Sequence, residues 1–320
     1  MLKGILLVLS ACFFWGFIFV IPGLMTGYNS LEIALGRYFF FGIASCFFIL
    51  FKGLHKWGTF PLSIWKKAFL YALVVNVIYY FSLVTGLFYS GASVIVLLVG
   101  ISPITLTFYG NWHHKVCSNR VLILPSVLIA CGLICVNFSA FSSPETETSW
   151  KYGFGLLCGL FSLIIWNWYV IANAEFLKKN PHVSPSDWST MIGVGTFAWV
   201  ILICATLMLI IPMHDRFKYP EWDSNISSFI LGGLILGLVC SWLGSYLWNC
   251  GSQALPISLA GQLTIFETIF GLIFVYLVEQ RFPSWIELTG ILTILGGVKL
   301  SMTRFNRSIS TTPEPVGEQI

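Results

Sequence analysis

Glu267 is the only acidic residue near the centre of one of the chain's long apolar runs, and its carboxyl group is the best placed to do chemistry inside a membrane. It follows Pro256 by 11 residues, which is about 16 Å along a helix. A charge at that depth costs roughly 2.5–3.5 kcal/mol on the insertion scale, so the side chain is expected to face a cavity or a partner. We therefore predict a carboxyl group that couples to a proton or binds a cation. The alternative interpretation is a neutral carboxyl group that hydrogen bonds to neighbouring helices.

Arg37 is the basic residue that lies inside an apolar run rather than in a break between runs. It stands six residues into the second run, so its long side chain has the reach to approach the depth of Glu267 and pair with it. The other interpretation is that Arg37 extends outward to the lipid headgroups. The sequence leaves both open.

A second group of candidates consists of aromatic and amide side chains that lie deep in the apolar runs. Tryptophan and tyrosine ordinarily gather at the two membrane interfaces, whereas here several lie near mid-run. Buried rings with a polar edge offer stacking surfaces and attraction for cations, and amides are costly when they face lipid. Helix packing with internal hydrogen bonds is the alternative. The predicted substrate-binding cavity comprises Trp15, Asn76, Tyr79, Tyr80, Trp166, Tyr246, Asn249, Gln262 and Glu267.

The chain contains no residue pattern of an enzyme's catalytic centre or of a bound cofactor. A nucleophile elbow, an H-E-x-x-H zinc site and a nucleotide-binding phosphate loop are all missing. Cys131 and Cys135 stand at helical spacing, but two thiols without histidine or carboxylate neighbours are typical of small apolar packing residues rather than of a metal site. We therefore predict no catalytic residue, no metal and no cofactor. Without a nucleotide motor, any transport must be driven by gradients.

The composition indicates a polytopic membrane protein. The 320 residues are 57% hydrophobic and 9% charged, whereas soluble domains carry about 25% charged residues. Charges gather in short breaks between apolar runs of about 20 residues, the length that crosses the hydrocarbon core. The net charge of +4 comes from loop lysines and a basic end rather than from one basic face. The expected partners are therefore the lipid bilayer and a small-molecule substrate, and not nucleic acid.

The sequence predicts an all-α fold of ten transmembrane helices. Lysine and arginine are more frequent in the breaks on the N-terminal side of the membrane than in the others, twelve against four, which predicts that both termini are cytoplasmic. The expected spans cover residues 4–25, 31–51, 67–89, 92–112, 121–139, 152–174, 188–212, 228–250, 256–278 and 284–302.

Two halves of the chain resemble each other. A shift of 165 residues aligns Gly86 with Gly251 and the polar break that follows His113 with the break near Ser284, and a shift of 151 aligns Trp15 with Trp166. Because each half has five spans, an odd number, the second half must enter the membrane from the opposite side, and such inverted repeats favour a site at their interface. The expected domains are residues 1–142, residues 143–303 and a disordered cytoplasmic tail at 304–320.

Several segments resemble the EamA branch of the drug/metabolite transporter superfamily, and within it the YtfF-type inner-membrane proteins. The resemblance covers about residues 3–303. The family's proline in the ninth span is replaced here by Thr268. The segments that carry the resemblance are Trp15–Val20, Leu35–Tyr38, Ile101–Pro103, Ser241–Asn249, Ile265–Thr268 and Gly290–Lys299.

This resemblance implies a ten-helix secondary transporter of the inner membrane. It would export small metabolites, often amino acids and related compounds, by alternating access between its two halves. We further expect spans 1, 3, 4, 6, 8 and 9 to enclose the cavity. An uptake or exchange carrier is the main alternative, because direction depends on gradients rather than on the fold. A membrane-embedded enzyme that acts on lipid-linked substrates and a structural or sensory subunit are further alternatives.

Overall fold

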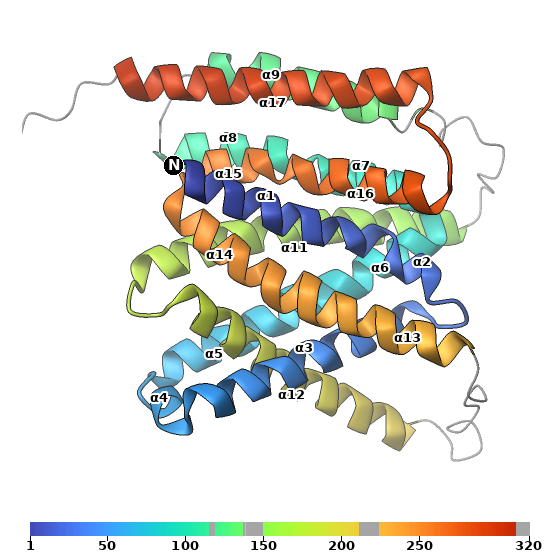
Figure 1. The fold of residues 1–320 in the computed structure, drawn as a ribbon, viewed down its shortest axis with the longest axis vertical. Coiled ribbons are helices and arrows are strands. Elements are labelled where there is room, and N and C mark those ends of the chain that lie inside the picture. Colours follow the sequence, from blue (N-terminus) through green and yellow to red (C-terminus); the bar gives the residue numbers. More distant parts are fainter. Residues whose placement is uncertain (115–118, 137, 139–149, 211–223, 312–320) are drawn as a thin grey trace, which may run out of the picture.

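The fold is a bundle of helices packed side by side (Figure 1). The structure, a computed structural model, describes residues 1–114, 119–136, 138, 150–210 and 224–311. Within these ranges the regular structure is entirely helical, which confirms the expected all-α class. The helices of the first half are α1 (Leu2–Gly16), η1 (Phe17–Phe19), α2 (Ile21–Leu24), α3 (Ser30–Lys52), α4 (Leu54–Gly58), α5 (Leu62–Tyr71), η2 (Ala72–Ile78), α6 (Tyr79–Ser90), α7 (Ala92–Gly100), α8 (Ser102–His114) and α9 (Asn119–Val136).

The second half continues with a similar series of long helices. These are α11 (Trp150–Lys179), α12 (Pro185–Ile210), α13 (Ser224–Leu234), η3 (Ile235–Leu243), α14 (Gly244–Ala254), α15 (Ile257–Leu263), α16 (Ile265–Val278) and α17 (Trp285–Thr311).

Among the described residues, seven helical stretches are long and apolar enough to cross a membrane. Leu122–Val136 within α9 is a shorter apolar helix. The chain is thus a multi-pass membrane protein, while the count of ten spans in two inverted repeats stays a prediction. The seven stretches are Leu2–Leu24, Ser30–Lys52, Leu62–Ser90, Trp150–Lys179, Pro185–Ile210, Ile226–Ala254 and Leu259–Val278.

The sequence fixes where α3 begins and ends. Asn29 accepts hydrogen bonds from the backbone N–H groups of Leu31 and Glu32, and the Glu32 carboxylate accepts one from the N–H of Asn29 in return. This capping box satisfies N–H groups that the first turn of a helix leaves without partners. Gly53 ends the helix with a φ of 85°, a conformation that favours glycine. Arg37 is thereby held in the second turn of α3.

Several membrane helices are irregular at matching places in the two halves. η2 and η3 are π-helical segments in the middle of the predicted third and eighth spans, within the apolar stretches Leu62–Ser90 and Ile226–Ala254, and both are continuous with the α-helices on either side. The fourth span is interrupted at Ile101 and the ninth at Thr264. π-helical turns inside α-helices are rare and frequently mark functional sites, and helix interruptions in transporters surround binding sites.

α9 and α17 form a closely packed pair at one edge of the bundle (Figure 1). A Cβ atom at Gly132 would lie 2.6 Å from the carbonyl oxygen of Gly290, and one at Gly290 would lie 2.7 Å from that of Gly132. Only glycine fits this approach, because any side chain would separate the two backbones. The pair shares a small apolar core with α16, separate from the large core that surrounds the site described below.

The two ends of the bundle differ in the connections that they carry. In Figure 1 the N-terminus, α4, the connection between α11 and α12 and the end of α17 lie at one end, whereas the connections from α2 to α3 and from α16 to α17 lie at the other. Successive breaks between apolar runs were assumed to lie on opposite sides of the membrane when their lysines and arginines were counted, and these connections do lie at opposite ends of the bundle (Figure 1). Which end is cytoplasmic stays a prediction.

The boundaries of several elements differ from those expected. The third span begins at Leu62 rather than at residue 67, and α11 continues to Lys179 rather than ending at residue 174. α17 continues to Thr311, so the expected tail boundary at residue 304 falls within a helix. The nearest helix-breaking residue is Pro313, which explains why the helix does not end earlier. The expected boundary between the halves, at residues 142 and 143, lies outside the described residues, as do residues 312–320.

Candidate functional site

A small cavity lies inside the bundle, among residues of both halves of the chain. Its volume is about 30 Å³, which has room for one or two water molecules and for no metabolite. The lining residues are Trp15, Ile18, Arg37, Tyr38, Val75, Asn76, Tyr79, Trp166, Tyr169, Ser241, Ser245 and Glu267.

The cavity walls come from the first, second, third, sixth, eighth and ninth spans. The second span lines this cavity although we did not expect it to, while the expected contribution of the fourth span stays a prediction. α3 supplies Arg37 and Tyr38, while no lining residue belongs to α7 or α8 within the described part of the chain. Gly237 of η3 lets α3 approach closely, because a Cβ atom there would lie 2.6 Å from the carbonyl oxygen of Arg37.

Arg37 is buried and points inward. Its Nε atom donates a hydrogen bond to Ser241 Oγ at 2.8 Å, and its guanidinium carbon lies 4.1 Å from the centre of the Tyr80 ring and 5.1 Å from that of Tyr38. The ring faces attract the cation, and the hydrogen bond orients it. Nη1 is fully buried, and no described residue forms a hydrogen bond with it. The interpretation that Arg37 extends outward to the headgroups is therefore wrong.

Glu267 lines the same cavity but does not pair with Arg37. Its side chain is 5% exposed, and within the described residues its carboxyl oxygens take part in no hydrogen bond and no ion pair within 4 Å. Glu267 lies in the first turn of α16, where its backbone N–H donates to the carbonyl of Thr264. The interruption at Thr264 thus places a helix N-terminus within the bundle, and the positive end of the helix dipole favours a negative charge there.

Aromatic rings surround these two ionisable groups. Trp15 donates a hydrogen bond from Nε1 to the backbone carbonyl of Cys240 at 2.9 Å, and its ring meets that of Trp166 edge to face at 5.3 Å. Tyr79 stacks on Trp166 at 5.5 Å, and Tyr169 lies 5.8 Å from Trp166 on the same helix. Because Trp15 and Trp166 come from the first span of each predicted repeat, the two halves meet through these rings.

Asn76 connects the cavity to a neighbouring helix. It lies in η2, and its amide donates to Thr196 Oγ1 of α12 at 2.7 Å. Ser241 of η3 accepts from Arg37 and donates to the carbonyl of Leu236 at 2.9 Å. A shift of 165 residues aligns Asn76 with Ser241, so the two π-helical segments present polar side chains to the cavity from matching positions.

Four of the expected cavity residues lie outside the lining. Tyr80 is buried beneath Arg37, and Tyr246 stacks on Trp242 with ring centres 5.7 Å apart. Asn249 accepts a hydrogen bond from Asn173 and donates one to Ser189. Gln262 is 1% exposed, and neither atom of its amide has a partner among the described residues. Trp15, Asn76, Tyr79, Trp166 and Glu267 are brought together as expected.

The sequence analysis missed six lining residues. Tyr38 directly follows Arg37, and Tyr169 lies one helical turn after Trp166, so neighbouring positions were the available signal for both. Ser241 carried a repeat signal through its alignment with Asn76. Serine, isoleucine and valine occur on every face of membrane helices. Nothing in the sequence therefore distinguishes Ser245, Ile18 or Val75 as a lining residue.

A second polar cluster lies at the end of the bundle where α3 ends and α12 begins. The Asp187 carboxylate accepts from Lys52 Nζ at 3.0 Å, from Lys56 Nζ at 2.7 Å and from Ser184 Oγ at 2.6 Å. The carboxylate is almost fully buried, whereas the two lysines remain partly exposed. A buried charge is tolerated when it is fully paired, so this cluster holds the end of α3 against the start of α12.

Comparison with known proteins connects these features to a family. Residues 2–138 match the EamA-like transporter family. The chain is 28% identical over 309 residues to the inner membrane protein YtfF of Escherichia coli, with coverage of 94% of this chain and 95% of that protein. A 55-residue stretch is 34% identical to an uncharacterized transporter of Haemophilus influenzae, covering 17% of this chain and 32% of that one.

One solved crystal structure has the same fold as this chain. It superposes with a TM-score of 0.73 and covers 95% of this chain and 98% of that one, at 14% sequence identity. At this identity the similarity establishes the fold and not the function.

Proposed function

We propose that the protein, whose residues 2–138 match the EamA-like transporter family, is a secondary transporter of the inner membrane that exports a small polar or amphipathic metabolite. An amino acid or a related compound is the cargo that fits best. The membrane location is supported by the apolar helices and by the similarity to an inner membrane protein. Both termini then face the cytoplasm.

The observation that carries the proposal is the charge arrangement in the cavity. The Arg37 guanidinium and the ionisable carboxyl group of Glu267 line one cavity and do not pair with each other. A buried charge without a partner is costly, so each group gains free energy when a ligand supplies the missing contact. We assign Glu267 to an amino group of the cargo or to a proton, and the aromatic rings to the cargo's apolar part.

Transport proceeds by alternating access of two inverted five-span halves. The matching π-helical segments and the matching interruptions at Ile101 and Thr264 support the repeat. The cavity lies where the two halves meet, and its closed form corresponds to the state between inward and outward opening. The cavity must widen by several hundred Å³ to admit a metabolite, because ligand pockets measure about 300–1,000 Å³.

Counterflow in proteoliposomes tests the assignment of Glu267. The purified protein is screened with amino acids and related compounds inside the vesicles, and uptake of labelled compound is measured against pH. We expect Glu267→Gln to reduce counterflow at least tenfold and to flatten its pH dependence. Glu279→Gln, which changes an exposed carboxylate at the end of the same helix, is the matched control and should transport normally. Normal uptake and pH response in Glu267→Gln would remove the proposed role.

A further inference from the structure

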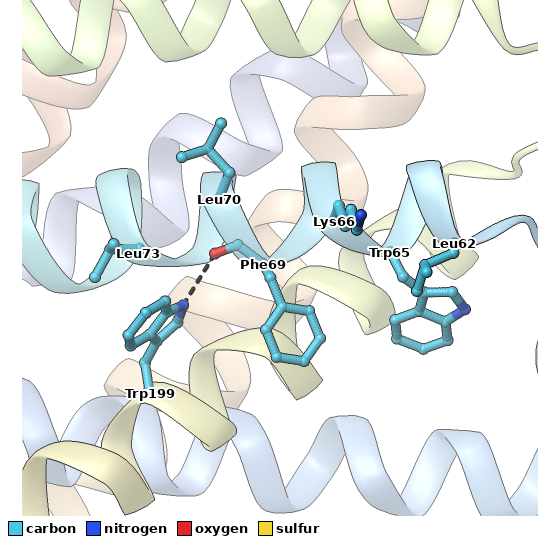
Figure 2. Close-up of a pocket in the computed structure, with 7 residues that line it drawn as sticks. All are labelled: Leu62, Trp65, Lys66, Phe69, Leu70, Leu73 and Trp199. Carbon is cyan, nitrogen blue, oxygen red and sulfur yellow. Dashed lines mark hydrogen bonds between the residues drawn. The ribbon is translucent and has the colours of Figure 1, made fainter.

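An apolar groove lies between α5 and α12, on a surface separate from the cavity (Figure 2). Its volume is about 480 Å³. Phe69, Leu73 and Trp199 line it along its length, and Trp65 and Lys66 lie at the end where α5 begins. None of these residues lines the cavity.

The groove has the shape and chemistry of an alkyl-chain site. From the first turn of α5 to Leu73 it extends about 16 Å along the helix. Trp199 donates its indole N–H to the backbone carbonyl of Phe69 at 3.0 Å, as the dashed line in Figure 2 shows, so the ring offers no free donor to a ligand. A polar metabolite would find no hydrogen-bond partner along this wall, whereas an acyl chain needs none.

The end of the groove carries an uncompensated positive charge. Residues 52–67 contain four lysines and no acidic residue. Lys52 and Lys56 are bound by Asp187, whereas Lys66 is exposed and has no ion pair or hydrogen bond among the described residues. Anionic headgroups are attracted to lysines beside a membrane span, and tryptophan next to them is typical of the membrane interface.

We propose that this groove binds a phospholipid with an anionic headgroup. One acyl chain lies against Phe69, Leu73 and Trp199, and Lys66 binds the phosphate. The lipid comes from the membrane leaflet at the α5 end of the bundle.

The bound lipid touches the helix pair that forms one wall of the cavity. Two hydrogen bonds join these segments: Trp199 to the Phe69 carbonyl in the groove, and Asn76 to Thr196 at the cavity. Thr196 precedes Trp199 by three residues, so the α12 partners of both hydrogen bonds lie on one turn of that helix. Occupancy of the groove therefore restrains the position of Asn76.

Native mass spectrometry of the delipidated full-length protein tests the site. Phosphatidylglycerol and phosphatidylcholine with identical acyl chains are titrated separately, and the bound fraction is measured. We expect tighter binding of phosphatidylglycerol and about a fivefold loss of that affinity in Lys66→Gln. Lys299→Gln removes an exposed lysine elsewhere on the protein and is the matched control, which should bind normally.

Two further measurements locate the lipid and identify its source. Phosphatidylglycerol with a photoreactive acyl chain should label residues 62–73 and the peptide around Trp199, and Leu73→Trp, which fills the groove, should abolish that label. Inorganic phosphate should not compete. Equal affinity for the two lipids, unchanged binding in Lys66→Gln, labelling spread evenly over the membrane helices, or displacement by phosphate would each overturn the proposal.

Discussion

Gly244 provides the most direct test of how the cavity is built. A Cβ atom at this position would lie 2.6 Å from Nε1 of Trp15 and 3.0 Å from its Cδ1 atom. Two neighbouring rings limit how far the indole can retreat, because the ring centre of Trp166 lies 5.3 Å from that of Trp15 and the ring centre of Trp248 lies 5.6 Å from it. Gly244→Ala must therefore displace the Trp15 ring and weaken its hydrogen bond to the carbonyl of Cys240.

The magnitude follows from these two effects. Forcing a methyl group into a packed core costs about 1–3 kcal/mol, and loss of one hydrogen bond costs about 0.5–1.5 kcal/mol. The alanine gains up to about 1 kcal/mol of helix propensity, so the net destabilisation is about 1–3 kcal/mol. For a chain of this size that corresponds to a fall in Tm of roughly 2–5 °C.

Thermal unfolding of the detergent-solubilised protein, followed by circular dichroism, measures this effect. Gly296→Ala is the matched control, because a Cβ atom there meets nothing within 4 Å, and its Tm should stay the same or rise. Trp15→Phe removes the Nε1 atom, so Gly244→Ala should cost less in that background than in the native chain. Equal Tm values for Gly244→Ala and Gly296→Ala would refute the packing argument.

Two other substitutions have outcomes that the structure determines. Asp187→Asn breaks two ion pairs that share one buried carboxylate. Because the two lysines are partly exposed, this change should lower the free energy of unfolding by about 1–2 kcal/mol. Glu175→Gln breaks an exposed ion pair and should cost less than about 0.5 kcal/mol in the same unfolding measurement. Arg37→Lys keeps the charge but loses the planar guanidinium group that lies over Tyr80 and is oriented by Ser241. This variant should fold normally and reduce counterflow at least tenfold. Native transport rates would contradict a specific role for the guanidinium.

The sequence alone determined the class of the protein and the identity of its most unusual residues. The apolar runs are long enough to cross a bilayer, and the charges are confined to the breaks between them. Such runs form membrane helices, because a helix satisfies its backbone hydrogen bonds within the segment. A carboxylate as deep as Glu267 must face the protein interior, because lipid offers it no partner. The placement of Trp15 and Trp166 in the cavity followed in the same way from their depth and from the repeat.

Only the tertiary structure decided which deep residues share the cavity. A helix that is apolar on all sides has no polar stripe to indicate the face it turns inward, so depth is readable from the sequence while rotation is not. Asn249 and Asn76 looked equivalent by that criterion, yet one bonds to Asn173 and Ser189 and the other lines the cavity. The inward direction of Arg37 likewise depended on Ser241, which lies 204 residues away along the chain and reaches α3 only because Gly237 permits the close approach of η3.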